Sequence, residues 1–185
     1  MLVVEGSIPY LEQTNCPDST NKKKGCPIKI IIDSREQTPL IFTQEFVTET
    51  PVEALPVGDY GCEFDRGYQV PAIFERKSIP DLFSTLTQNM DRFKREIEKA
   101  KKLGIKLILI IEGSVSQVAW GTAYSKVNGH SILKTVFTLW IKYDLMPVFC
   151  VDKNDMSNFI YNYYCAIGRK AQSDLKEQRA KRRKT

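Results

Sequence analysis

Residues 57–81 of the 185-residue chain read VGDYGCEFDRGYQVPAIFERKSIPD, and they carry the clearest signals of secondary structure in the sequence. Two segments typical of β-strands, at about 57–64 and 69–76, flank a turn-forming Asp-Arg-Gly sequence at 65–67. Ser78 then has the residue type of a helix N-cap, with a proline and an aspartate in the first turn. The stretch therefore predicts an antiparallel hairpin that leads directly into a helix.

The rest of the chain extends this pattern outward. Short runs rich in Ile, Leu and Val predict buried strands, and longer runs with apolar residues three and four apart predict helices. Further strands are expected at 29–33, 106–111 and 147–151. Helices are expected at 78–102 with a break at Asn89, at 131–143 with Leu133, Phe137, Trp140 and Ile141 on one face, and at 155–170. A loop is expected at 51–56, and 114–129 is ambiguous between a short helix and a loop. This order predicts an α/β fold with a central mixed β-sheet and helices on both faces.

Composition limits the class of protein. A chain of this length with 42% hydrophobic residues is expected to form one domain with a sizeable core, which excludes global disorder. The longest aliphatic run, 107–111, is far shorter than the roughly 20 residues that cross a bilayer, and the N-terminal residues lack the pattern of a secretory signal. The five cysteines are an odd number. Together these features predict an intracellular protein with reduced thiols and no membrane association.

The net charge of +5 is concentrated at the C-terminus. From Arg169 onward there are eight basic and two acidic residues, a charge of +6, so the remainder carries −1. We divide the chain into an irregular arm at 1–26, a folded domain at 27–168 and a flexible basic tail at 169–185. The tail is expected either to contact a polyanion such as a nucleic acid or to be a solvated end that binds nothing. The basic residues expected to make that contact are Lys181, Arg182, Arg183 and Lys184.

Two carboxylates stand at the open end of the expected hairpin, Asp59 on one arm and Glu75 on the other. If the hairpin closes about its turn, they become neighbours and offer oxygen ligands to one hard divalent cation. Lys77 points to the same strand face as Glu75, where it can orient a metal-bound water or accept its proton. This is the minimum equipment for metal-assisted phosphodiester hydrolysis. Glu36 can serve a second metal or hold a water on the first, and Arg35 can steady a phosphate through its bidentate fork.

Taken singly, such residues at strand ends are more often surface ion pairs than parts of an active site. The full set is far more specific. Residues 57–60 followed by 75–82 closely resemble the GD…ERKxxxD signature of the XPF/Hef-type structure-specific endonucleases, which carry an ERCC-four domain. Residues 31–36 resemble the V-D-x-R-E segment of that family, and 107–112 its Leu-Ile-Ile-Glu strand. The resemblance extends over roughly 28–165.

This resemblance implies a restriction-endonuclease-like fold of the PD-(D/E)xK type, with three layers, and DNA cleavage that depends on Mg²⁺ or Mn²⁺. It implies that Asp59 and Glu75 bind the metal and that Lys77 positions the attacking water. The residues that would complete the site are Asp33, Arg35, Glu36, Arg76 and Asp81. Action on branched or flap DNA in repair or recombination, and a location at the nucleoid or in the nucleus, are expected as well.

The helix after the signature bears on DNA contact. Arg92 falls where the family has the arginine of an Arg-Leu-x-x-Gln sequence, but Glu96 replaces the glutamine. We expect Arg92 to contact DNA, together with Arg35 and Arg76. His130 is a further candidate, because it opens a helix whose N-terminus favours phosphate.

Aromatic residues crowd the last expected helix and exceed one core-facing stripe. They are Phe159, Tyr161, Tyr163 and Tyr164. Since the nuclease domains of the family pair, we expect a homodimer or heterodimer through this domain. Two alternatives to a DNA endonuclease stay open: a non-catalytic DNA-binding or scaffolding subunit with a nuclease-like fold, and a nuclease that acts on RNA.

Overall fold

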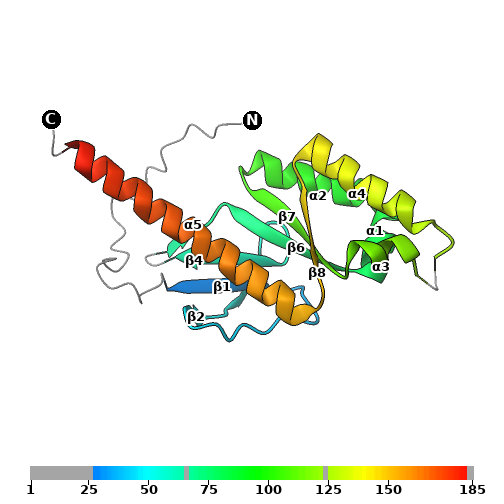
Figure 1. Ribbon diagram of the computed structural model, residues 1–185, viewed down its shortest axis with the longest axis horizontal. Helices are drawn as coiled ribbons and strands as arrows, with labels where there is room; N and C mark the ends of the chain where they lie inside the picture. Colours follow the sequence, from blue (N-terminus) through cyan, green and yellow to red (C-terminus); the bar gives the residue numbers. More distant parts are fainter. Residues whose placement is uncertain (1–26, 65–66, 123–124, 183–185) are drawn as a thin grey trace.

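The computed structural model describes residues 27–64, 67–122 and 125–182 (Figure 1). The predicted arm at 1–26, residues 65–66 of the predicted turn, and Arg183 and Lys184 lie outside the described residues. Among the described helices, none is both long and apolar enough to span a lipid bilayer.

A mixed β-sheet forms the centre of the molecule, as the sequence predicts. Its strands are β1 (Ile28–Asp33), β2 (Val47–Glu49), β3 (Val52–Glu53), β4 (Tyr60–Phe64), β5 (Tyr68–Gln69), β6 (Ala72–Ser78), β7 (Lys106–Glu112) and β8 (Met146–Cys150). Six of them follow the order β2-β1-β4-β6-β7-β8, while β3 pairs with β1 and β5 with β4. Strand β4 is antiparallel to both β1 and β6, whereas β6, β7 and β8 are parallel.

Helices cover both faces of this sheet (Figure 1). They are α1 (Ile79–Thr87), α2 (Met90–Lys102), α3 (Val115–Trp120), α4 (Gly129–Tyr143) and α5 (Lys153–Arg182). Strand β7 divides its side chains between two hydrophobic cores. Ile108 and Ile110 join the core beneath α5, and Leu107, Leu109 and Ile111 join the core beneath α1, α2 and α4. The alternation is that of a strand buried on both faces, and it confirms the predicted three-layer α/β arrangement.

The predicted hairpin is present but more divided than expected. Its arms are antiparallel, with Tyr60 of β4 opposite Phe74 of β6. The first arm begins at Tyr60 rather than at residue 57, because Gly58 adopts a φ of +66°, which interrupts the extended chain. In the second arm Pro71 separates β5 from β6, since proline has no N–H to donate to a ladder.

The helix that follows is broken where the sequence predicts. Ser78 is the N-cap of α1, and its hydroxyl accepts the Asp81 N–H at 3.2 Å. Helix α1 ends at Thr87, and α2 begins at Met90, so the break falls at Asn89. The two edge strands β2 and β3 were expected as loop at 51–56 or not at all, because segments of two or three residues carry no readable periodicity.

Helix α4 turns a different face to the core from the one expected. Its buried apolar residues are Ile132, Leu133, Val136 and Leu139, besides Gly129. Of the predicted set only Leu133 is buried, and Ile141 is 84% exposed. The helix carries apolar residues around most of its circumference, so periodicity alone did not select the buried stripe.

Helix α5 is much longer than the predicted 155–170. It continues to Arg182 and in Figure 1 extends beyond the sheet. The predicted end near Lys170 is wrong, because 169–182 consist mostly of strong helix formers and contain neither glycine nor proline. An ion pair one turn apart, from Lys170 Nζ to Asp174 Oδ2 at 2.9 Å, also supports this extension.

Candidate active site

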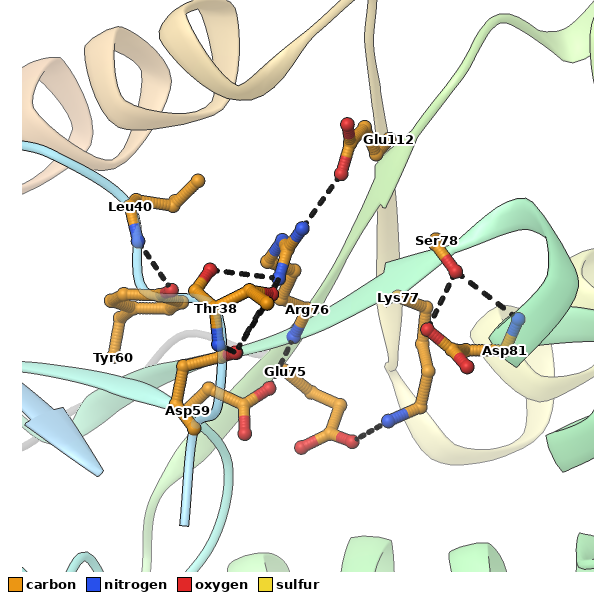
Figure 2. Close-up of polar contacts among 11 residues, drawn as sticks. Thr38, Leu40, Asp59, Tyr60, Glu75, Arg76, Lys77, Ser78, Asp81 and Glu112 are labelled. Atoms are coloured by element: carbon orange, nitrogen blue, oxygen red, sulfur yellow. Dashed lines mark hydrogen bonds and ion pairs between the residues drawn. The ribbon is translucent and has the colours of Figure 1, made fainter. Parts of the chain in front are cut away.

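The backbone at the β4–β6 junction brings the two signature carboxylates together. The Asp59 N–H donates to the Phe74 carbonyl at 2.7 Å, so Asp59 lies beside the strand residue that follows, Glu75. The Asp59 side chain accepts the Arg76 N–H through Oδ2, also at 2.7 Å. Glu75 is 5% exposed and extends from β6 on the same side as Lys77, whose ammonium donates to Glu75 Oε1 (Figure 2). Sequence reasoning thus placed these three residues correctly relative to one another.

The electrostatics of this cluster are unfavourable for two bare carboxylates. Burial raises the pKa of Asp59 to about 6, against the opposing effects of the Arg76 N–H and the Lys77 ammonium. Burial and the neighbouring charge of Asp59 raise the pKa of Glu75 to about 8. Burial acts to lower the pKa of Lys77, but the negative charges of Glu75, Asp59 and Glu96 together outweigh it and raise the pKa above its usual value. This cluster therefore combines a cationic lysine with two acids that resist being ionised at the same time.

The donor set fits a hard divalent cation. Mg²⁺ in proteins commonly binds to one or two carboxylates and completes its shell with waters and substrate phosphates. One oxygen of each carboxyl group is already in a hydrogen bond, Asp59 Oδ2 with the Arg76 N–H and Glu75 Oε1 with the Lys77 ammonium. Within the part of the chain that the structure describes, no hydrogen-bond donor reaches the other oxygens, Asp59 Oδ1 and Glu75 Oε2. Among the described residues, no group of three or more His, Cys, Asp or Glu side chains is arranged to hold a metal. The fit is therefore to a two-carboxylate site.

Arg76 lies on the opposite face of β6 (Figure 2). Its Nη2 donates to Glu112 Oε2 at 2.7 Å, and its Nη1 donates to Thr38 Oγ1 at 3.0 Å. Nη1 also lies 3.5 Å from Glu36 Oε1, and the side chain is only 10% exposed. The guanidinium is thus occupied by protein acceptors, which leaves little of it for a phosphate, although its Nε is buried without a partner among the described residues.

The structure does not bring Glu36 into one cluster with Asp59 and Glu75. The Glu36 carboxylate accepts the Thr38 N–H at 2.8 Å and lies against Arg76. Its negative charge still helps to raise the pKa of Asp59. Glu36 therefore influences the Asp59–Glu75–Lys77 cluster through its charge without being part of it.

Asp33 and Arg35 form a unit of their own at the end of β1. Asp33 is 1% exposed and accepts four N–H groups: the Arg35 N–H, Nε and Nη2, and the Leu55 N–H at 2.7 Å. Burial acts to raise the pKa of Asp33, but these hydrogen bonds outweigh it and hold the pKa below its usual value. Since ionised aspartate has about four acceptor sites, Asp33 is saturated and positions Arg35, whose side chain is 69% exposed.

The remaining predicted residues whose side chains the structure describes are exposed, and none of them has a hydrogen bond to Asp59, Glu75 or Lys77. Asp81 is exposed at the first turn of α1 and accepts the Ser78 hydroxyl. Arg92 is exposed on α2, and His130 is exposed in the first turn of α4, where its N–H donates to Asn128 Oδ1. Lys181 is exposed near the end of α5.

Two acids that sequence reasoning did not assign to the site contact its backbone or one of its predicted residues. Glu96 Oε1 of α2 accepts the Gly58 N–H at 3.2 Å, next to Asp59. Glu112, the last residue of β7, holds Arg76. Both acids fall in segments already aligned with the family. Glu96 stands at the glutamine position of Arg-Leu-x-x-Gln, and Glu112 stands at the glutamate of Leu-Ile-Ile-Glu. That alignment is the signal that could have identified them.

Comparison with known proteins gives consistent results. A family model described as the ERCC4 domain matches residues 32–163. Two solved structures are similar at 17% identity: XPF from Aeropyrum pernix (TM-score 0.57, covering 81% of this chain and 69% of that one) and XPF from Aeropyrum pernix in complex with DNA (TM-score 0.55, covering 79% and 66%). The chain thus spans about two thirds of the length of each, and the likeness confirms the restriction-endonuclease-like fold. None of the curated proteins compared with this chain matches it significantly.

Proposed function

The chain belongs to the ERCC4 domain family, and from this premise we propose that it is a metal-dependent endonuclease that hydrolyses phosphodiester bonds in DNA. The observation that carries the proposal is the burial of Asp59 and Glu75 side by side, with Lys77 beside them. Two neighbouring buried acids resist being ionised together, and a divalent cation stabilises both as carboxylates. The family match and the similarity to an XPF structure in complex with DNA support DNA as the substrate.

Each residue of the Asp59–Glu75–Lys77 cluster, and each charged residue near it, has a distinct role in this proposal. Asp59 and Glu75 would hold Mg²⁺ or Mn²⁺, which when bound lowers the pKa of a coordinated water and stabilises charge on phosphate oxygens. Lys77, as a cation fixed by Glu75, would orient the attacking water. Arg35, held by Asp33 but mostly exposed, would donate its remaining N–H groups to the phosphate. Arg76 and Glu36 would position the strand rather than touch substrate.

We further propose that the substrate is branched or flap DNA, in repair or recombination, which places the protein at the nucleoid or in the nucleus. Lys181, which is exposed near the end of α5, would contact the DNA backbone. Removing 169–185 would then weaken binding and reduce its salt dependence, because fewer counterions are released. An unchanged salt slope would contradict this role.

A cleavage assay tests the activity directly. The full chain is incubated with flap, fork and linear duplex DNA, and with RNA, in Mg²⁺ or in Mn²⁺. Asp59→Ala and Lys77→Ala should lose cleavage, whereas Glu98→Gln, an exposed acid on α2, should retain it. Binding of DNA without cleavage that the variants abolish would instead favour a non-catalytic subunit, and cleavage confined to RNA would change the substrate class.

We also propose that two copies of the chain pair through the outer face of α4 rather than through the aromatic residues of α5. Tyr164 is fully buried in the core, and Phe159, Tyr161 and Tyr163 are partly buried and pack against the same core, so these rings are largely used within the domain. On α4, by contrast, Ile141 is 84% exposed.

The spacing on α4 supports a second copy as the occupant. Lys134, Phe137 and Ile141 of α4, and Asp144, the C-cap that follows the helix, are spaced three, four and three residues apart, and such intervals are typical of a helix–helix seam. Asp144 Oδ2 also lies 3.6 Å from Lys106 Nζ. In an antiparallel pair about a two-fold axis, Phe137 falls opposite Ile141 and Lys134 falls opposite Asp144, since both pairs are centred on Leu139. An apolar centre with complementary charges at its ends is what a self-complementary interface needs.

Sedimentation analysis separates this interface from other surfaces. Ile141→Glu should yield monomers. Val52→Glu should not, although it makes the same kind of polar change at an exposed apolar position, because Val52 lies on β3, the strand that pairs with β1. Lys134→Glu should weaken the dimer, and Lys134→Glu with Asp144→Lys should restore it. A monomeric wild type, or a dimer indifferent to Ile141→Glu, would contradict the proposal.

A further inference from the structure

Helix α2 holds the backbone segment that carries Asp59. The Glu96 carboxylate accepts the Gly58 N–H at 3.2 Å, and the Lys99 ammonium donates to the Pro56 carbonyl at 2.6 Å. Positions three apart lie on the same face of a helix. One face of α2 therefore fixes two backbone groups within three residues of each other.

This segment has little freedom of its own. Gly58 has a φ of +66°, and a Cβ there would lie 2.6 Å from Ile73 Cγ2 and 3.0 Å from the Phe74 carbonyl oxygen. The next residue, Asp59, is fixed to the same Phe74 carbonyl by its N–H. A shift of Gly58 is thus transmitted directly to the Asp59 carboxylate.

The negative charge of Glu96 also acts on the Asp59–Glu75–Lys77 cluster. Its carboxylate helps to raise the pKa of both Asp59 and Glu75, and it helps to raise the pKa of Lys77 and Arg35 as well. The side chain is half-buried, so this charge is only partly screened by water. A third negative charge therefore faces the two candidate metal ligands.

We propose that Glu96 is a positioning residue of the cation site, with two separable effects. Its oxygen holds Gly58 and thereby aims Asp59 at Glu75, and its negative charge strengthens divalent cation binding by those two carboxylates. The inference rests on the proposed metal-dependent function. At this position the chain has a glutamate where the family pattern has a glutamine. A glutamine oxygen could still accept the Gly58 N–H, but it would supply no negative charge.

Three variants of the full chain separate the two effects. Glu96→Gln keeps an oxygen that can accept the Gly58 N–H but removes the charge. Glu96→Ala removes both. Glu98→Gln is the matched control, because it makes the same charge change on an exposed position of the same helix.

The first measurement is the affinity for Mn²⁺ in the absence of DNA, from the electron paramagnetic resonance of the free ion. Glu96→Gln should weaken Mn²⁺ binding about tenfold, as is common when groups around a metal ligand are altered, and Glu96→Ala should weaken it further. Glu98→Gln should change it less than about twofold. Equal affinities for Glu96→Gln and Glu98→Gln would overturn the charge effect.

The second measurement is hydrogen exchange of the Gly58 amide without metal. The amide should remain protected in Glu96→Gln and exchange faster in Glu96→Ala, which tests the positioning effect independently of metal and activity. Equal protection in both variants would overturn that effect. If the wild type binds no Mn²⁺, both the proposed function and the charge effect are wrong. If the wild type binds Mn²⁺ and cleaves DNA, but Glu96→Gln and Glu98→Gln do not differ, only this inference is wrong.

Discussion

The two faces of β6 carry the same kinds of residue in opposite states. On one face, Glu75 meets Lys77 and lies beside Asp59, and burial raises the pKa of both carboxyls. On the other face, Arg76 is bound by Glu112 and Thr38 and lies against Glu36. Side chains alternate along a strand, so three consecutive residues serve two separate environments.

Both faces combine one cation with two acids, but they arrange them differently. On the Arg76 face, the guanidinium lies against both Glu36 and Glu112. On the Glu75 face, the Lys77 ammonium donates to Glu75 while Asp59 accepts the Arg76 N–H, and burial raises the pKa of both carboxyls. Two buried acids that resist being ionised together are stabilised as carboxylates by a divalent cation, which makes the Glu75 face the one that a cation completes.

The largest effect should follow from Asp59→Asn on the Glu75 face. The amide keeps an oxygen to accept the Arg76 N–H but offers the cation no negative charge. Cleavage of DNA should fall by about 10³-fold, close to 4 kcal/mol of transition-state stabilisation. The melting temperature without metal should stay equal or rise, because the repulsion with Glu75 is removed. Single-turnover kinetics and thermal unfolding measure the two quantities, and a variant that retains cleavage while it loses stability would reverse the assignment of this face.

Arg76→Met on the opposite face should have the converse effect. It leaves the carboxylates of Glu36 and Glu112 without their cation, and breaking such a buried pair costs about 3 kcal/mol. The free energy of unfolding in urea should fall by about that amount, with a smaller loss of cleavage than in Asp59→Asn. Arg76→Met combined with Glu112→Gln should recover part of the stability, since one orphaned charge is gone. Loss of cleavage at unchanged stability would show that Arg76 acts on the substrate.

The sequence carried enough information for the fold class and for the Asp59–Glu75–Lys77 pocket. Strand alternation and hairpin closure determine that pocket, and both are local properties. It did not reveal that Glu36 and Glu112 both neutralise Arg76, because these partners lie 40 and 36 residues away from it in the sequence. It likewise did not show which stripe of α4 is buried, since that depends on the sheet against which the helix packs.

Gly58→Ala should have an intermediate effect and test how tightly the reactive face is built. The new Cβ would meet Ile73 Cγ2 at 2.6 Å, and a φ of +66° is strained for any residue with a side chain. We expect a loss of about 2 kcal/mol in the free energy of unfolding together with weaker Mn²⁺ binding, because Asp59 moves with its neighbour. Gly67→Ala is the control: φ is +80° there, but nothing lies within 4 Å of the added Cβ. If the two variants bind Mn²⁺ equally, strain rather than displacement of Asp59 explains the result.

Thr38→Val should give the smallest change, and it refines the comparison on the Arg76 face. Valine keeps the shape of threonine but removes the Oγ1 that accepts from Arg76 Nη1 at 3.0 Å. The contact is exposed, and the Thr38 carbonyl still accepts from the same nitrogen at 3.3 Å, so the free energy of unfolding should fall by no more than about 1 kcal/mol. Cleavage should be unchanged within about twofold, because the Glu75 face does not touch Thr38. A larger loss of cleavage than of stability would mean that the two faces are coupled through Arg76, whose own N–H binds Asp59.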